Sequence, residues 1–274
     1  GIKRIFLGGS LPPQLRGNFL HLYADVAWFG VLSGSTIAFL SVYATRLGAN
    51  GSQIGLINAA PAIVNLLLAL PFGALIGRLN ITKAVFWTAA LQRIFYILII
   101  PFPFLILPQP QIWAIILVIL VMSVPGTGVA VGFNALFAEA VPAEWRARVV
   151  GTRNALLALV TTVTTLGCGE ILTNSTLESG YQMIFAIGGL GAAMSNLHLW
   201  FVRPVVPPQS SPITRRAGSR LRFEIVTGKF GKILLLLMFF HFAQFLAIPI
   251  FPVFSVNVLK LSDRIIGLGT ALFN

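Results

Sequence analysis

Acidic residues are scarce in this chain of 274 residues, and charge of either sign is rare. It has 7 Asp and Glu against 19 Lys and Arg, and charged residues make up 9% of the sequence. About a quarter is usual for soluble domains. Hydrophobic residues make up 57%, and the mean hydropathy is +0.89. A soluble fold could not cover so much apolar surface, so the composition excludes a soluble globular protein.

Cysteine is almost absent. Cys168 is the single cysteine and lies in an apolar stretch, which excludes a disulfide framework and a cysteine-based metal site. The sequence also has no glycine-rich phosphate loop of the GxxxxGK type, which argues against direct ATP hydrolysis by this chain. We therefore expect no cofactor, no metal, no covalent chemistry and no enzymatic activity, and we interpret Cys168 as a small packing residue.

The excess of basic residues gives a net charge of +12, which could indicate nucleic-acid binding. These residues are dispersed among short loops rather than gathered on one face, so we expect no nucleic-acid partner. Attraction to anionic lipid headgroups and the control of membrane topology explain the charge instead.

Long apolar segments are the main feature that is present. A helix needs roughly 20 residues to cross a hydrocarbon core about 30 Å thick. Segments of that length are found at 20–45, 53–77, 84–107, 112–138, 151–173, 181–202 and 233–258. Their unbroken apolar runs favour helices over alternating barrel strands. The sequence thus predicts an all-α polytopic membrane protein with seven spans.

Basic residues alternate from one side of these spans to the other. Of the 19 Lys and Arg, 15 lie in the first, third, fifth and seventh polar segments. Only Arg46, Lys260 and Arg264 lie in the segments between, and Arg93 lies inside a span. Because cytoplasmic loops accumulate Lys and Arg, we expect the N-terminus and the loop 204–232 to be cytoplasmic, with the chain in the inner cell membrane.

The loop 204–232 is the longest polar segment and has the composition of a linker, with prolines, serines and a basic cluster. An offset of 212 residues aligns the end of the first span with the end of the seventh, and Gln53-Ile54-Gly55-Leu56 with Ile265-Ile266-Gly267-Leu268. The apolar run 265–274 is too short to cross a bilayer. We expect a six-helix bundle at 1–203, an inter-domain linker at 204–232, and an incomplete second bundle from 233 to 274, with the chain ending inside an eighth span.

Two short loops carry motifs. Between the second and third spans, Gly73 and Gly77 are followed by Arg78 and Lys83. Between the fourth and fifth, Glu139, Pro142 and Arg146 follow at spacings of three and four. Both loops resemble the cytoplasmic signatures of the major facilitator superfamily. Gly77 departs from the pattern, because the family usually has an aspartate there, and this removes the carboxylate of the usual contact between the halves.

These motif residues have physical roles that do not depend on the resemblance. Gly73 and Gly77 form a small-xxx-small pair that allows a neighbouring helix to approach. Arg78 and Lys83 can pair with carboxylates or with helix C-terminal carbonyls. Glu139 and Arg146 could form a partly buried ion pair that holds one conformation and releases in another. The alternative is that both loops only anchor headgroups and set the topology.

Ionisable and polar side chains within spans are candidates for substrate or proton binding. Asp25 lies near the start of the first span and Arg93 about ten residues into the third. They could neutralise each other or bind substrate, and the resemblance implies that the third span is scaffold. His241 and Gln244 share one face of the seventh span, where His241 could exchange a proton or simply pack.

The resemblance implies a secondary-active transporter that moves a small solute by alternating access, driven by a proton or solute gradient. Its expected partners are the lipid bilayer and a small-molecule substrate, and we expect a monomer at full length. Sparse charge in the candidate cavity slightly favours a neutral or lipophilic solute. Alternatives from other classes are a permease subunit of an ATP-driven transporter and a seven-helix receptor or channel.

Overall fold

The computed structural model describes residues 13–105, 107–205 and 228–273 of the chain. These residues form helices joined by short turns, and no strand occurs among them. The bounds of the helices are α2 (Pro13–Leu32), the π-helical turn η1 (Ser33–Ile37), α3 (Ala38–Arg46), α4 (Gly51–Ile76), α5 (Ile81–Leu98), α6 (Phe102–Leu105), α7 (Pro108–Ala140), α8 (Ala143–Thr173), α9 (Leu177–Phe201), α11 (Lys229–Ala247), α12 (Ile250–Val253), the π-helical turn η2 (Phe254–Val258) and α13 (Asp263–Phe273).

Among the described residues, five helical segments are long and apolar enough to cross a membrane: 15–46, 51–76, 108–140, 143–173 and 177–201. They confirm five of the seven predicted spans and the all-α membrane class. The predicted span 84–107 is divided, since α5 ends at Leu98 and α6 begins at Phe102. Pro101 lies between them, and proline removes a helical N–H donor and disfavours helix at the preceding residue.

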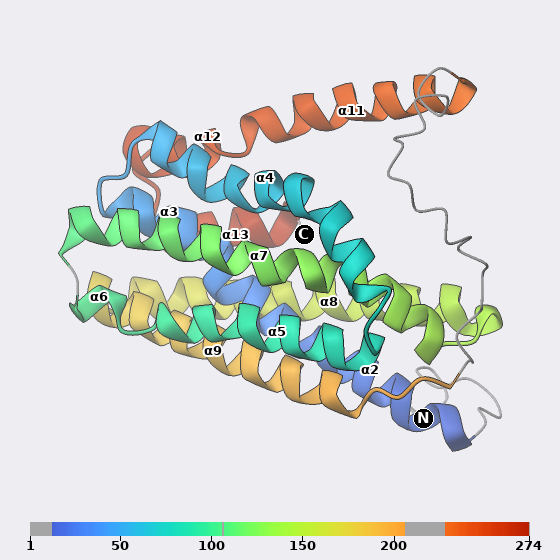
Figure 1. Ribbon diagram of the computed structural model, residues 1–274. Helices are drawn as coiled ribbons and strands as arrows, with labels where there is room; N and C mark the ends of the chain where they lie inside the picture. The colour runs from blue at the N-terminus through green and yellow to red at the C-terminus, as the bar shows by residue number, and fades with distance from the viewer. Residues whose placement is uncertain (1–12, 106, 206–227, 274) are drawn as a thin grey trace.

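The predicted span 233–258 is likewise interrupted. It corresponds to α11, α12 and η2 in succession, with Pro249 at the break between α11 and α12. The described side chains of α11 are exposed, including Leu236 and Phe240. Figure 1 shows α11 at the edge of the molecule, apart from the bundle formed by α2 to α9.

The helix starts are set locally by side chains of the turns. Asn50 and Gln53 form a reciprocal capping box at the start of α4, with both hydrogen bonds at 2.9 Å. Asn80 accepts a hydrogen bond from the Lys83 backbone N–H at the start of α5. Such caps satisfy N–H groups that have no partner inside the helix.

Neighbouring helices of the bundle pack in both antiparallel and parallel pairs, since α2 and α9 run in opposite directions while α2 and α8, like α4 and α7, run in the same direction. α2 packs on α8 and α9, α5 packs on α7 and α9, and α4 packs on α7. The turns at 77–80 and 141–142 and the residues after α9 lie at one end, which we call the basic end. The turns at 47–50, 174–176 and 259–262 lie at the other, which we call the opposite end (Figure 1).

Close packing at the centre depends on glycine. A Cβ added at Gly34 would clash with the backbone oxygen of Thr161 on α8, and one at Gly132 would lie 2.7 Å from Val85 on α5. One buried cluster, which includes Phe19 and Leu136, fills the basic-end half. A second, which includes Tyr43 and Phe185, fills the opposite-end half.

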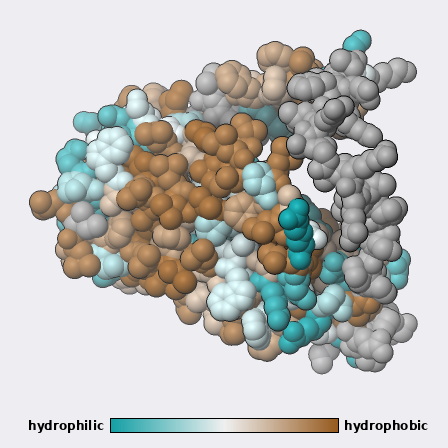
Figure 2. Space-filling view, in the orientation of Figure 1, coloured by the Kyte–Doolittle hydropathy of each residue, from teal (hydrophilic) through white to brown (hydrophobic). Residues whose placement is uncertain are grey.

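The outer surface is apolar. In the orientation of Figure 1, hydrophobic residues cover the middle of the molecule, and hydrophilic ones gather towards its two ends (Figure 2). Leu66 and Leu70 of α4 are 81% and 74% exposed. Such a surface is compatible with lipid around the middle of the helices rather than water.

The helix ends follow the 212-residue offset found in the sequence. α3 ends at Arg46 and η2 ends at Val258, while α4 begins at Gly51 and α13 begins at Asp263. α13 packs on α8, so the second copy of the pattern contacts the first bundle.

Candidate functional site

A buried ion-pair network lies at the centre of the bundle. Asp25 of α2 is 3% exposed and lies close to three side chains from three other helices. One carboxylate oxygen accepts a hydrogen bond from the Ser195 hydroxyl of α9 at 2.6 Å and lies 3.6 Å from Nη2 of Arg93 on α5. The other oxygen lies 3.3 Å from Nη2 of Arg153 on α8. We call these groups, together with Asn196, the Asp25 network.

The two arginines of the network have further partners. Arg93 donates to the Ser195 hydroxyl at 2.8 Å and to the Asn196 side-chain oxygen at 3.1 Å. The Arg153 guanidinium lies 4.5 Å from the centre of the Phe133 ring, a cation–π distance. Its Nε is buried without a hydrogen-bond partner. The network therefore ties α2, α5, α8 and α9 together and extends to α7.

Two guanidinium groups accompany one carboxylate, so the network has an excess positive charge. Isolated charges in a membrane are costly, and pairing with hydrogen bonds offsets that cost. The arrangement can hold the four helices in register, and it can also respond to any change in the charge of its members.

The structure brings together two of the candidates from the sequence, Asp25 and Arg93, and pairs them. Sequence reasoning missed Arg153, because it was counted among the loop residues that set the topology. It lies in α8, which begins at Ala143. Ser195 and Asn196 were also missed, since an adjacent Ser and Asn in an apolar helix carry no distinctive signal.

His241 and Gln244 do not lie on any of the helices that carry the Asp25 network. Both lie on α11, where the His241 side chain is exposed and its ring lies 5.8 Å from that of Phe240. The side chain of Gln244 lies outside the described residues.

The motif after the second span lies at the basic end. A Cβ at Gly73 would make an ordinary contact of 3.9 Å with Val131 of α7, and one at Gly77 would meet only its own helix. Arg78 and Lys83 are exposed, and neither forms an ion pair within the part of the chain that the structure describes. Gly73 therefore makes only an ordinary helix contact, and the expected close approach is not seen at either glycine of this motif.

The motif after the fourth span is arranged differently from the expected ion pair. Arg146 donates to the backbone oxygens of Ala138 at 2.9 Å and Val141 at 3.1 Å, so it caps the end of α7. Pro142 is the N-cap of α8. The Glu139 backbone oxygen accepts a hydrogen bond from Val205, and no ion pair joins Glu139 to Arg146 in the described residues. The C-terminal carbonyls attract the guanidinium because they carry the negative end of the helix dipole.

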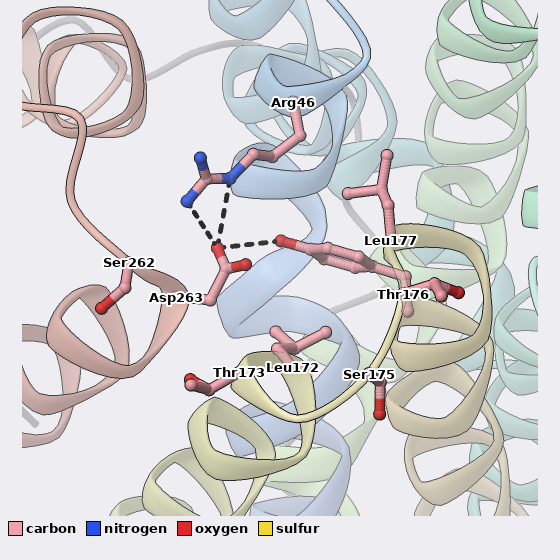
Figure 3. A pocket seen from close by; sticks show the side chains of 9 residues that line it. Arg46, Leu172, Thr173, Ser175, Thr176, Leu177, Ser262 and Asp263 are labelled. Carbon is pink, nitrogen blue, oxygen red and sulfur yellow. Dashed lines mark hydrogen bonds and ion pairs between the residues drawn. The ribbon is translucent and has the colours of Figure 1, made fainter.

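A second polar cluster lies at the opposite end and was not expected from the sequence. Arg46 at the end of α3 donates to Asp263 at 3.1 Å and to the backbone oxygen of Leu261 at 2.7 Å. The Tyr181 hydroxyl of α9 donates to the same Asp263 oxygen at 3.3 Å. We call Arg46, Tyr181 and Asp263 the opposite-end clamp. Figure 3 shows Arg46 and Asp263 pointing toward each other at a pocket of about 340 Å³.

The same end has a second contact between α8 and α13. Arg264 lies 3.3 Å from Glu170, with both side chains more than half exposed. Next to this pair α8 and α13 approach closely, since a Cβ at Gly169 would lie 3.2 Å from the Arg264 backbone.

Among the described residues, no group of three or more His, Cys, Asp or Glu side chains is placed to hold a metal ion. The Cys168 thiol is buried.

The helices and the buried network define a polytopic α-helical membrane protein. Residues 26–273 match the family model of the Major Facilitator Superfamily, which is most of the chain. The chain therefore belongs to the major facilitator superfamily, a family of secondary transporters, as the two loop motifs indicated. No curated protein and no solved structure matched the chain.

Proposed function

We propose that this protein moves a small solute across the inner cell membrane by alternating access, driven by a proton or solute gradient. Family membership supports secondary transport over the permease-subunit and receptor or channel alternatives. The observation that supports alternating access is the opposite-end clamp, because it joins the first bundle to α13, which lies in the part of the chain after the predicted linker.

Contacts between the two parts of the chain begin at the opposite end and continue along α13 to Thr162 in the middle of α8. Arg46, Tyr181, Glu170 and Gly169 of the first bundle contact the start of α13 at the opposite end. On the side of the basic end, α11 exposes its described side chains. In alternating access, the two halves of a transporter contact each other at one end and separate at the other. Contacts concentrated towards one end support that arrangement.

The clamp is suited to open and close. Its two charged side chains keep 25% and 14% of their surface exposed. Partly exposed ion pairs contribute about 0–1 kcal/mol, and such a contact can break in each transport cycle without a large barrier.

Within this proposal, 1–203 forms the first six-helix domain, 204–232 the cytoplasmic linker, and 233–274 the start of the second domain. Asp25 and Arg93 remain our candidates for responding to substrate or proton binding. We add Arg153 to them. We expect a monomer that performs no covalent chemistry.

Cysteine labelling tests the clamp. With the buried Cys168 replaced by Ser, a Ser175→Cys variant places one thiol at the wall of the clamp pocket. Asp263→Asn removes the charge that holds Arg46, so the pocket should open more often and maleimide labelling should accelerate. If the pair contributes about 1 kcal/mol, the increase is about fivefold.

Glu170→Gln is the matched control, because it removes the more exposed Arg264–Glu170 pair at the same end. Its labelling rate should stay near that of the parent. Equal labelling rates in the Asp263→Asn variant and the parent would contradict a clamp that controls access.

A further inference from the structure

Two of the three histidines of the chain meet where α2 and α9 pack together. The Nδ1 atoms of His21 on α2 and His198 on α9 are 3.1 Å apart, which is hydrogen-bond distance. The His21 ring also stacks on Phe201, with ring centres 5.0 Å apart and planes at 24°. Both histidines are half-buried. We call them the histidine pair.

The histidine pair lies next to the Asp25 network. His21 precedes Asp25 by four residues, and His198 follows Ser195 by three, so each lies about one helical turn from the Asp25–Ser195 hydrogen bond. α2 and α9 pack against each other and run in opposite directions. Both turns therefore lead towards the basic end.

The hydrogen bond limits how many protons the pair can hold. In the neutral pair, one Nδ1 is protonated and donates a hydrogen bond to the unprotonated Nδ1 of the other ring. A proton added at the Nε2 of the donor ring makes an imidazolium and leaves this bond in place, now charge-assisted. A second added proton would place N–H against N–H and force the rings apart.

We propose that the histidine pair is a proton-binding site that takes up one proton and transmits its charge to the Asp25 network. Imidazole is the side chain that ordinarily changes charge between pH 5 and 8. This assignment rests on the proposed transport function for its purpose, since a gradient-driven carrier needs a group that binds and releases the coupling ion.

The charges around the pair explain why one proton has an effect. Asp25 on α2, Arg93 on α5 and Arg153 on α8 already leave one positive charge in excess. Arg16 and Arg203 lie exposed towards the basic end. A proton on the pair adds a second excess charge beside Asp25, so it competes with the two arginines for that carboxylate.

Histidine NMR tests the site directly with the proton as the ligand. The protein is labelled with ¹⁵N-histidine, purified in lipid nanodiscs and titrated with pH. Its three histidines are assigned by the variants His21→Gln, His198→Gln and His241→Gln. We expect His21 and His198 to titrate as a coupled unit.

The variants give reciprocal outcomes. His198→Gln should move the titration midpoint of His21 by about one pH unit, and His21→Gln should move that of His198 similarly, as interacting sites do. His241→Gln is the control and should leave both midpoints in place. Independent titration of His21 and His198, or no titration of either between about pH 4 and 9, would overturn the proposal.

A second measurement separates this proposal from the transport mechanism. The titration requires neither a substrate nor a functional clamp, so it can succeed where the Ser175→Cys labelling fails. In Asp25→Asn protein the histidine midpoints should shift, because the nearest negative charge is lost. Unchanged midpoints would show that the pair does not act on the network.

Discussion

At the scale of single residues, the Asp25 network depends on side chains that are distant in sequence and meet only in the folded bundle. Asp25, Arg93 and Arg153 lie on three helices, and Ser195 on a fourth bridges Asp25 and Arg93. Burial makes each charge costly alone and strongly favours its pairing. Removing one partner therefore destabilises the fold, because the remaining charges stay buried without compensation.

Asp25→Asn is expected to destabilise the protein, because Arg93 and Arg153 would stay buried without their carboxylate. Breaking a buried pair in this way costs about 3–5 kcal/mol. The unfolding midpoint in detergent should fall accordingly. The double variant Asp25→Asn with Arg93→Gln should lose less than the sum of its single changes, since it leaves fewer unpaired charges.

Glu144→Gln serves as the control, because Glu144 is an exposed carboxylate of α8. It should shift the midpoint little. An additive double variant would argue against a direct Asp25–Arg93 interaction.

At the scale of elements, contact between α8 and α13 depends on glycine. A Cβ at Gly169 would lie 3.2 Å from the Arg264 backbone, and one at Gly267 would lie 3.2 Å from the Thr165 backbone oxygen. Backbone atoms cannot move aside as flexible side chains do. The glycines let α13 lie close to α8. This close packing places Asp263, at the start of α13, near Arg46 and Tyr181.

Gly169→Leu should push α13 away from α8, and overpacking of this kind costs about 1–3 kcal/mol. The thiol of Ser175→Cys in the clamp pocket should then react faster with maleimide. Gly167→Leu, two residues earlier on the same helix, is the matched control, because nothing lies within 4 Å of a Cβ there. Similar acceleration in both variants would mean that helix propensity, and not contact with α13, is responsible.

At the scale of the whole molecule, the apolar middle and the two polar ends define an orientation in the membrane (Figure 2). Lys83 is exposed at the basic end and Lys260 at the opposite end. We propose that the basic end faces the cytoplasm, because Lys and Arg accumulate in cytoplasmic loops.

Labelling from each side of the membrane tests this orientation. In a Cys168→Ser background, Lys260→Cys should react with a membrane-impermeant maleimide in intact cells, while Lys83→Cys should react only in inverted vesicles. The reverse pattern would overturn the assigned orientation. Permeabilised cells, in which both thiols should react, provide the control.

Much of the fold could be predicted from local sequence. The breaks near Pro101 and Pro249 divide segments that were predicted as continuous spans. Five of the seven spans, the register of the repeat and the family follow from patterns that can be read in order along the chain. Their physical basis is local, since apolar length, missing N–H donors and loop charge act within one segment.

The candidate site was only partly predictable. Asp25 and Arg93 stand out because a charge inside an apolar span is conspicuous by itself. Arg153 looks like a loop residue, and His21 with His198 looks like two isolated histidines. Arg146 faces its own helix end, although its spacing from Glu139 suggested a pair. Which residue meets which depends on how helices rotate and pack, and residue spacing alone does not specify that.

The sequence by itself determined that this is a helical membrane protein of the major facilitator superfamily, because hydrophobic length and loop motifs are properties of continuous segments. Only the tertiary structure decided the partners of its buried charges, the histidine pair and the opposite-end clamp. These contacts join residues that are distant in sequence, such as Asp25 with Ser195 and Arg46 with Asp263. Their geometry is set by the close packing of whole helices in three dimensions.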